Sequence, residues 1–508
     1  MLRTFLLTSL PFCFGLIVLG ASVSCMAQGG FGAMGSNAAA IPKDRLNESW
    51  WADRHKAVLA QVKEHADAQL LMIGDSITNN YEKTTLPDEN FLPTWKEFYE
   101  PRKALNLGFS GDTTANLLWR LQHGEVDGLH PKVAVVLIGT NNTGNAKQTA
   151  EQTEVGIDAV MAELERRLPE TKILLLGVLP SAISTAKTDE DEAVNRYLAS
   201  SYGENPRVTY LDIGSIFFDY SGGEGKLKTE IFYDPRLSWH GAALHPDTVG
   251  QRRMAEAIEP TLARLMGDAP AVPLASMTDI NTALIPTERL EVDSYDWYAR
   301  HHAEVALAKT MRPKVVLIGD SITNFWAGEP YSNRVNGAAA WQQAFGDTPT
   351  LNMGFGWDRV QNVLWRLQQG EFDGLAPEFV VLNIGTNNLT GTEHARASTP
   401  EEIVDGIAAI KRELMKRSPH SHLVLMAIFP RGASAGDPLR APIQQTNRLL
   451  AQRFGADASV TLLDIGAKFL APDGALPAAM MPDGVHPSEA GYAIWAEALR
   501  PILLSKRF

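Results

Sequence analysis

Residues 71–79 read LMIGDSITN, and residues 316–324 repeat this stretch as VLIGDSITN, so that Ser76 and Ser321 occupy matching positions 245 residues apart. Each serine follows a short apolar run through Gly-Asp and precedes a segment that can begin a helix. An apolar run of this length is typical of a strand buried on both faces. The stretch therefore predicts two equivalent strand ends, each followed by a serine.

The repeat extends beyond these nine residues. LWRLQ at 118–122 recurs at 364–368, and IGTNN at 138–142 recurs at 384–388. A period near 245 residues is much longer than the about 20–50 residues of solenoid repeats. The sequence therefore indicates one domain present in two copies.

Each copy alternates strand-like and helix-like segments. In the first copy we expect strands over 69–73, 132–138, 172–179 and 208–213, because these runs are almost continuously apolar. Helical spacing of apolar residues follows at 157–168, and again at 403–414 in the second copy. This alternation predicts an α/β fold, with each copy a three-layer α/β/α sandwich around a parallel sheet.

The boundaries follow from composition and from the repeat. We expect a signal peptide at 1–27, a flexible Gly/Ala-rich spacer at 28–45, a first domain at 46–267, a proline-containing linker at 268–290 and a second domain at 291–508. The leader has Arg3, an apolar run over 5–19 and small residues up to Ala27, which is the pattern of a secretory signal.

Export to the periplasm or outside the cell is the expected location. An uncleaved membrane anchor is the alternative, although the apolar run is short and contains Pro11. Lipoprotein anchoring through Cys25 is disfavoured, because Ser22 stands three residues before it. No other segment is apolar for long enough to cross a bilayer, so we expect no stable membrane insertion once the leader is removed.

Composition excludes several classes of protein and site. The 508 residues are 45% hydrophobic and 21% charged, as in ordinary globular proteins. The net charge of −13, or −14 without Arg3, disfavours nucleic acid and anionic lipid surfaces as partners. Both cysteines, Cys13 and Cys25, lie in the leader, so the mature chain has no thiol nucleophile or cysteine-ligated metal. No phosphate-binding loop or His-Glu-x-x-His pattern occurs, and we expect no cofactor and no metal.

With thiols, metals and cofactors disfavoured, serine is the best-supported nucleophile. The C-terminal end of the second copy contains a candidate base. Asp483 precedes His486 by three residues, so its carboxylate can orient the ring and stabilise the imidazolium that forms when a serine loses its proton. Backbone N–H at Ser321 and Gly354 and the side chain of Asn387 are candidate donors to an oxyanion. Taken singly, the same residues also fit a helix cap, a turn glycine and an Asx turn.

In this order, the blocks Gly-Asp-Ser, Asn-x-Gly, Gly-Thr-Asn and Asp-x-x-His-Pro resemble the SGNH (GDSL) hydrolases, over nearly all of both copies. The stretch from residue 106 to 142 looks closest to the branch that contains the platelet-activating factor acetylhydrolase catalytic subunits. The resemblance implies a flavodoxin-like fold and metal-free hydrolysis of carboxylic esters. Carried over block by block, it makes Ser321 the nucleophile, His486 the base, Asp483 its partner, and Gly354 and Asn387 parts of the oxyanion hole.

The first copy departs from this pattern at one position. Its matching residues are Ser76, Gly108, Asn141 and His245, but Ala242 stands where the carboxylate is expected. Asp234 or a backbone carbonyl is a possible substitute. Two hypotheses therefore stay open for this copy: a Ser-His dyad esterase with reduced activity, or a degenerate domain that binds substrate or supports its sister.

The sequence thus predicts a secreted serine esterase acting on short-chain, chiefly acetyl, esters, with carbohydrate as the alcohol side. A lipid acetylhydrolase and a non-catalytic carbohydrate-binding protein are the alternatives. For the second class, four tryptophans of the second copy are candidate sugar-stacking surfaces: Trp297, Trp326, Trp341 and Trp357. The two copies are also expected to be able to pack together as an intramolecular pseudo-dimer.

Overall fold

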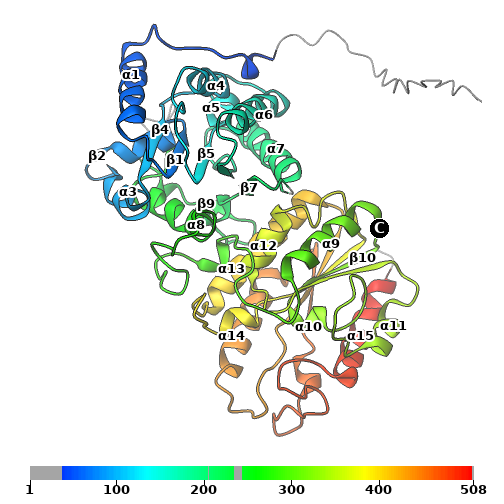
Figure 1. The fold of residues 1–508 in the computed structure, drawn as a ribbon. Coiled ribbons are helices and arrows are strands. Elements are labelled where there is room, and N and C mark those ends of the chain that lie inside the picture. Colours follow the sequence, from blue (N-terminus) through cyan, green and yellow to red (C-terminus); the bar gives the residue numbers. More distant parts are fainter. Residues whose placement is uncertain (1–36, 204, 234–242, 506–508) are drawn as a thin grey trace, which may run out of the picture. The chain divides into compact units, whose positions relative to one another are not determined.

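The computed structural model describes residues 37–203, 205–233 and 243–505 (Figure 1). The predicted signal peptide, half of the predicted spacer, Asp234 and Ala242 lie outside the described residues. Each copy contains a five-stranded parallel sheet with helices on both faces, which confirms the predicted fold class.

The first sheet has the strand order β4-β1-β5-β6-β7. Its strands are β1 (Leu70–Gly74), β4 (Ala104–Gly108), β5 (Val133–Leu137), β6 (Lys172–Leu176) and β7 (Val208–Leu211). Its helices are α1 (Ser49–Glu64), α2 (Ser76–Asn79), α3 (Leu92–Phe98), α4 (Thr114–Gln122), α5 (Thr140–Thr143), α6 (Ala150–Arg167), α7 (Thr185–Tyr202) and α8 (Thr248–Met266). Two small hairpins pair β2 (Thr84–Thr85) with β3 (Glu89–Asn90) and β8 (Phe218–Asp219) with β9 (Lys226–Leu227).

The second sheet has the matching order β11-β10-β12-β13-β14. Its strands are β10 (Val315–Gly319), β11 (Thr350–Gly354), β12 (Phe379–Asn383), β13 (His422–Met426) and β14 (Val460–Leu463). Its helices are α9 (Trp297–Thr310), α10 (Ser321–Asn324), α11 (Ala338–Phe345), α12 (Val360–Gln368), α13 (Pro400–Arg417), α14 (Arg440–Phe454) and α15 (Glu489–Leu504). The strands predicted for the first copy all form, two to three residues shorter at some ends.

The three layers follow from alternation along each strand. In β1, Leu71 and Ile73 pack with apolar residues of α1, α4, α6 and α7. Leu70 and Met72 point to the opposite face, where α3 and α8 cover the sheet. Because successive strand side chains leave opposite faces, a strand covered on both sides must be apolar throughout. This is why the runs before Ser76 and Ser321 contain no polar residue.

Strand register brings the expected site residues to one edge. Gly74, just before Asp75-Ser76, pairs with Gly108 of β4, and Gly319 pairs with Gly354 of β11 in the same way. The central strands β5 and β12 end on the same side, just before the Gly-Thr-Asn-Asn segments. Ligands of parallel α/β sheets bind at the carboxyl ends of the strands, where these residues lie.

The segments expected to be a spacer and a linker are packed rather than free. A 3-10 turn, η1 (Ala38–Ala40), is capped by Asn37, and its Ala39 is fully buried against α6. The turn η7 (Thr282–Leu284) is capped by Asn281 and packs against α12 and α13 in the same manner. Residues 37–45 are therefore not a flexible spacer. Each copy begins with the same docking arm, and the predicted boundaries at 46 and 291 fall after it.

Several hydrogen bonds join the copies. Gln368 at the end of α12 exchanges two hydrogen bonds with the backbone of Asp212, and Gln369 Nε2 donates to the carbonyl of Tyr210 at 2.9 Å. Both partners lie at or just after β7, the last strand of the first sheet. One apolar cluster also continues from α8 through residues 274–285 to α12, α13 and α14. The copies thus share core as well as polar contacts.

Candidate active sites

In the second copy, the expected nucleophile, base and carboxylate form a continuous chain. Ser321 Oγ lies 2.8 Å from His486 Nε2, and His486 Nδ1 lies 2.8 Å from Asp483 Oδ2. The other oxygen of Asp483 accepts the backbone N–H groups of Val485 and His486, at 3.0 and 2.8 Å. These two bonds fix the carboxylate in the short turn from which the ring projects. The three side chains therefore have the geometry in which a histidine takes a proton from serine.

The charges of this triad favour a neutral base beside an ionised acid. Burial raises the pKa of Asp483, but hydrogen bonds from His486 and Val485 outweigh it and bring the pKa to about 2. Burial lowers the pKa of His486, and the hydrogen bond and charge of Asp483 oppose that shift. Near neutral pH, Asp483 is thus ionised and His486 is free to accept a proton.

The expected oxyanion donors lie at this end of the sheet, but they are not equally free. One N–H of the Asn387 amide donates to the carbonyl of Asp358 at 3.0 Å, which leaves its second N–H for a substrate. The N–H of Gly354 donates to Asn352 Oδ1 at 3.0 Å. In the first copy Gly108 is engaged by Asn106 in the same way. The donor role of both glycines stays a prediction.

Sequence reasoning named Trp357 only as a sugar-stacking candidate and missed its place in the loop that follows Gly354. Trp357 has a left-handed backbone, with φ of +64°, and its N–H has no acceptor among the described residues. Its counterpart in the first copy is Gly111, with φ of +77°. A left-handed conformation is costly for a side chain other than glycine and is often kept at functional sites. The signal in the sequence was the difference at this aligned position, which is glycine in the first copy and tryptophan in the second.

A buried polar network supports the loop from behind and explains the repeated LWRLQ segment. Arg366 donates to Asp358 at 2.8 Å and to Glu371, and Trp297 Nε1 donates to the other oxygen of Asp358 at 2.9 Å. His301 Nδ1 lies 2.6 Å from Glu371. Because the carbonyl of Asp358 holds Asn387, this network positions the side chain that is expected to donate to an oxyanion.

The first copy repeats this network with its own residues. Arg120 donates to Asp112 at 2.7 Å, and Trp51 Nε1 donates to Asp112 at 2.9 Å. The carbonyl of Asp112 then accepts the amide of Asn141 at 3.0 Å. Ser76 Oγ lies 2.9 Å from His245 Nε2, so the expected nucleophile and base are in contact here as well. The framework of the first site is therefore intact up to the histidine.

The difference between the copies lies beyond that histidine. His245 Nδ1 is buried and has no partner among the described residues. Burial lowers the pKa of His245 to about 4, since no described carboxylate is hydrogen-bonded to the ring. Ala242 and Asp234 fall outside the described residues. That Asp234 supplies the carboxylate missing at position 242 therefore stays a prediction. The described part of the chain shows a Ser-His pair rather than a triad.

The tryptophans expected to stack on sugars divide into two groups. Trp297 and Trp326 are buried, with 1% and 0% of their surface exposed, so this prediction is wrong for them. Trp297 bonds Asp358, and Trp326 packs against Tyr492 and Trp495 in the core. Trp341 is partly buried against Phe345, whereas Trp357 is half exposed.

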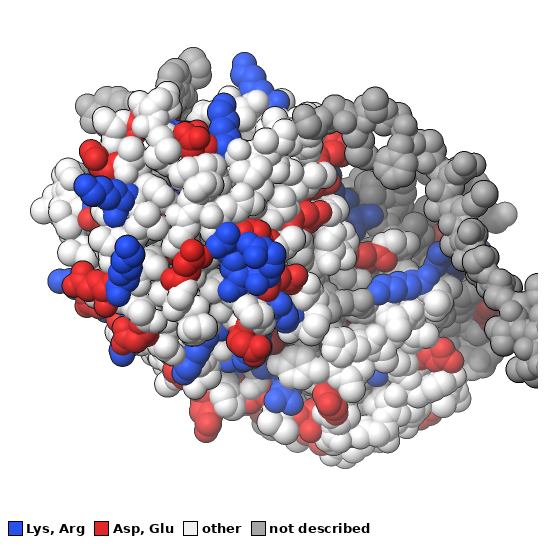
Figure 2. Space-filling model, turned by 45° about the horizontal axis from the view of Figure 1, so that its top comes forward, with Lys and Arg blue, Asp and Glu red and all other residues white. Residues whose placement is uncertain are grey.

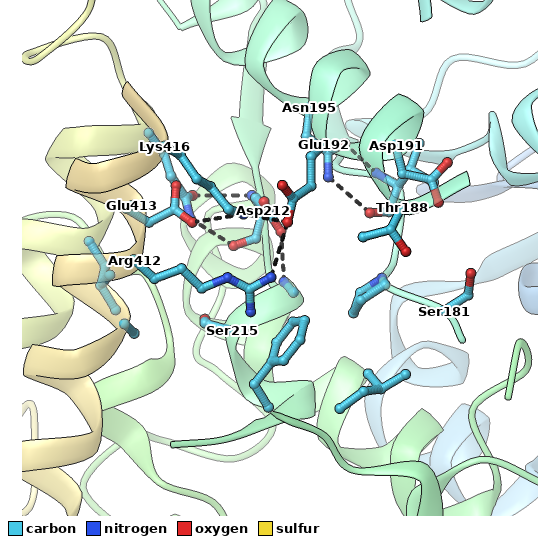
Figure 3. Close-up of a pocket in the computed structure, with 18 of the residues that line it drawn as sticks. Ser181, Thr188, Asp191, Glu192, Asn195, Asp212, Ser215, Arg412, Glu413 and Lys416 are labelled. Atoms are coloured by element: carbon cyan, nitrogen blue, oxygen red, sulfur yellow. Dashed lines mark hydrogen bonds and ion pairs between the residues drawn. The ribbon is translucent and has the colours of Figure 1, made fainter. Parts of the chain in front are cut away.

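A cavity of about 230 Å³ lies where α7 and the end of β7 meet α13 (Figure 3). Arg412 and Lys416 of α13 each lie 3.0 Å from Glu192 of α7. The cavity is lined by Ser181 and Ser215, but no histidine is among its described lining residues. It therefore differs from the two Ser-His sites described above.

Three further observations bear on partners. On the face shown in Figure 2, acidic and basic side chains are interspersed, so neither sign forms a single large patch there. Within the described residues, no group of three or more His, Cys, Asp or Glu side chains is arranged to hold a metal ion. The helices of the described part include none with the length and apolar character needed to span a bilayer.

Comparisons with known proteins match each copy separately. A family model described as GDSL-like lipase/acylhydrolase matches residues 72–253 and 317–494. The chain is similar to platelet-activating factor acetylhydrolase IB subunit alpha2 of Rattus norvegicus, with 31% identity over 230 residues that cover 45% of this chain and 93% of the relative. It is also similar to the alpha1 subunit of Homo sapiens, with 33% identity over 208 residues that cover 41% and 83%.

Two solved structures are also similar to part of the chain. An acetylxylan esterase from Geobacillus stearothermophilus is 22% identical with a TM-score of 0.30, covering 38% of this chain and 95% of that one. A GDSL-like lipase from Bacteroides thetaiotaomicron is 23% identical with a TM-score of 0.31, covering 41% and 96%. As with the relatives above, each neighbour spans less than half of this chain.

Proposed function

The chain belongs to the GDSL-like lipase/acylhydrolase family and is a carboxylic ester hydrolase, and from this premise we propose that its second copy cleaves short-chain, chiefly acetyl, esters through an acyl-enzyme. The observation that carries the proposal is the unbroken Ser321–His486–Asp483 chain, with 2.8 Å at both links. Neutral His486 beside ionised Asp483 is the pairing that general base catalysis needs.

The geometry supports a two-step reaction. His486 takes the proton of Ser321 while Oγ attacks the ester carbonyl, and Asp483 stabilises the imidazolium that forms. The backbone N–H of Ser321 and the free N–H of Asn387 stabilise the oxyanion. A third donor is the N–H of Trp357, or that of Gly354 once it no longer donates to Asn352. The alcohol leaves with the proton from His486. Water, deprotonated by His486, then attacks the acyl-serine and releases the acid.

The substrate proposed is an acetylated carbohydrate encountered outside the cytoplasm. Its support is the leader-like segment at 1–27, which fits export to the periplasm or the medium. A lipid acetylhydrolase is the second candidate, and it rests on the relatives named platelet-activating factor acetylhydrolase. The negative net charge favours uncharged substrates of either class.

We assign the first copy a smaller share of turnover. Its Ser76–His245 pair retains the proton acceptor, but Nδ1 of the ring lacks a partner in the described residues. Without an orienting acid, a serine triad loses about 10⁴-fold in rate, although binding and the oxyanion hole are retained. The shared core and the pairing of Gln368 and Gln369 with the backbone at the end of β7 support an intramolecular pseudo-dimer, in which this copy braces its sister.

Hydrolysis of a chromogenic acetate ester tests this assignment. We expect Ser321→Ala to remove most of the activity, by about 10⁴- to 10⁶-fold at the second site. Ser76→Ala should leave most of it, and the double variant should show none above background. If the unmutated protein has no turnover, the esterase proposal fails and a non-catalytic binding protein becomes the better account.

A further inference from the structure

A buried charged group lies beside the first site. Lys187 Nζ donates to Asp191 Oδ2 at 2.6 Å and to Thr143 Oγ1 at 3.1 Å, and Thr143 Oγ1 donates to Asp191 Oδ1 at 2.6 Å. The side chains of Lys187 and Asp191 are 3% and 5% exposed. We call Thr143, Lys187 and Asp191 the buried trio. Thr143 is two residues from Asn141, so the trio adjoins an expected oxyanion donor.

The second copy has only apolar residues at these three positions. Asn195 and Asn447 fix the alignment, because each exchanges two hydrogen bonds with the backbone just after β6 or β13. From this anchor, and from the repeated IGTNN segment, the counterparts of the buried trio are Leu389, Leu439 and Ile443. All three belong to or pack against the apolar core of the second copy.

Stability is not the better explanation of this difference between the copies. Replacing a buried ion pair by apolar residues of similar volume is often neutral or stabilising by about 1–4 kcal/mol, because both charges must lose their water. The second copy shows that the same framework accepts the apolar solution. Burial also raises the pKa of Asp191, a sign that the carboxylate has lost solvent. A role other than folding therefore accounts better for the buried trio.

That role is indicated by a cavity of about 840 Å³, which two members of the trio help to line. Thr143, Lys187 and Asn141 form part of its wall, and so does Leu244, the chain neighbour of His245. The Lys187 ammonium has three donors and uses two within the described residues, so one is left for a ligand. Figure 3 shows the side chains of Asp191 and Glu192 leaving α7 on different sides. The ion pair with Arg412 is made by Glu192 and not by Asp191.

The rest of the lining is mostly polar, and it includes Lys147 and Glu190, whose charges are opposite. Side chains with hydroxyl or amide groups come from Asn145, Gln148, Thr149 and Ser184, and apolar surface comes from Ile183 and Ala186. Hydroxyl-bearing ligands are recognised by such groups, while their C–H faces contact apolar side chains. We propose that this cavity binds a neutral saccharide that carries the ester, with the Lys187 ammonium donating to a sugar hydroxyl group. This inference rests on the esterase function proposed above.

The buried trio also decides between the two substrate classes. A fatty acyl or alkyl chain placed against Lys187 would leave the third donor without a partner, and an unpaired buried donor costs about 1–3 kcal/mol. The apolar trio of the second copy would be the better wall for such a chain. A saccharide instead supplies the missing acceptor.

The experiment uses the full chain with Ser76→Ala and Ser321→Ala, so that no ester is consumed. Partially acetylated xylohexaose is added, and hydrogen exchange is followed by mass spectrometry over 140–149 and 183–190. We expect protection of both segments. Adding Thr143→Leu, Lys187→Leu and Asp191→Ile, the residues of the second copy, should weaken this protection at least tenfold in half-saturating concentration.

A matched control replaces another i,i+4 ion pair of the first copy, Glu163 and Arg167 of α6, by Ile and Leu. We expect this control to leave the protection unchanged. Thr143→Val removes a single hydroxyl group and should weaken protection severalfold, which keeps the test decisive if the triple variant fails to fold by circular dichroism. Equal protection in the trio variants and their parent would overturn the proposal.

Two further outcomes are separable. Protection of these segments by a short-chain acetyl phospholipid, with none from the saccharide, overturns the proposal in favour of a lipid. If the catalytically intact chain hydrolyses chromogenic acetate but the saccharide gives no protection, saccharide binding in this cavity is contradicted and the esterase function is not. Saccharide protection without any hydrolysis contradicts the esterase function instead and leaves a binding protein.

Discussion

The two copies share a backbone plan and a buried network, yet their histidines stand in different surroundings. His486 has Asp483 at 2.8 Å from Nδ1, whereas the same atom of His245 has no described partner. At the positions of the buried trio the contrast is the opposite one, because the first copy has the ion pair of Lys187 and Asp191 where the second has leucine and isoleucine. The second copy thus has its additional charged group beside the histidine, whereas the first copy has its additional charged groups in the buried trio. Shared ancestry of fold therefore says little about which step each site performs.

The largest effect is expected at the carboxylate of the second site. In a chain with Ser76→Ala, Asp483→Asn should lower kcat for a chromogenic acetate by about 10⁴-fold, because the ring loses the group that sets its tautomer and stabilises its cation. Steady-state kinetics measure this directly. A loss of less than tenfold would mean that the two copies differ less than their histidines suggest.

The complementary change adds the missing acid to the first copy. In a chain with Ser321→Ala, Ala242→Asp should raise acetate hydrolysis at least tenfold, out of the about 10⁴-fold that an orienting acid contributes. The added charge should also raise the pKa of His245 above about 4, and the pH profile would move with it. Ala242→Asn supplies a matched control without the charge. If both variants behave alike, the missing negative charge beside the ring is not what limits the first site.

The pH dependence separates the copies without changing the acid. A base must be unprotonated, so kcat/KM falls as pH drops through the pKa of the histidine. With Ser76→Ala, the half-maximal pH should lie below 6.5, because burial lowers the pKa of His486. With Ser321→Ala, the residual activity should persist down to about pH 4, the pKa to which burial brings His245. Coincident profiles for the two variants would contradict this contrast.

The smallest effect compares the two docking arms. A Cβ added at Gly156 of α6 would lie 2.8 Å from Ala39 Cβ, and one at Gly406 of α13 would lie 3.1 Å from Ala283 Cβ. Overpacking costs about 1–3 kcal/mol, and the helix preference of alanine returns about 1 kcal/mol. We expect Gly156→Ala to lower the free energy of unfolding by up to about 2 kcal/mol, and Gly406→Ala by less. Urea denaturation monitored by fluorescence would show the order, and a stabilising Gly156→Ala would refute it.

Much of this arrangement was predictable, for a definite reason. The strand runs before Ser76 and Ser321 are apolar throughout because both faces of the sheet are covered. Parallel strands then carry whatever follows them to one edge, so the expected meeting of Ser321 with His486 needed only the order of the elements. The duplication strengthened each motif, because a chance match seldom occurs twice in the same order.

The remainder depends on contacts that sequence spacing does not encode. Trp297 and Trp326 were expected at the surface, but the first bonds Asp358 and the second fills the core, since burial is set by partners distant in the sequence. Residues 37–45 read as a Gly/Ala-rich spacer, although small residues are what close packing of a turn on a helix requires. The engaged N–H of Gly354 also depends on a side-chain rotamer of Asn352.

The matching arms have a practical consequence for dissecting the molecule. A fragment that begins at residue 291 would omit Ala283 and Ile285, both fully buried, and would expose the apolar surface of α12 and α13 beneath them. Such a fragment is expected to be poorly soluble, whereas one that begins near residue 274 keeps its own turn. The unit that was copied in this gene thus includes its docking arm, and recombinant halves should be cut ahead of it.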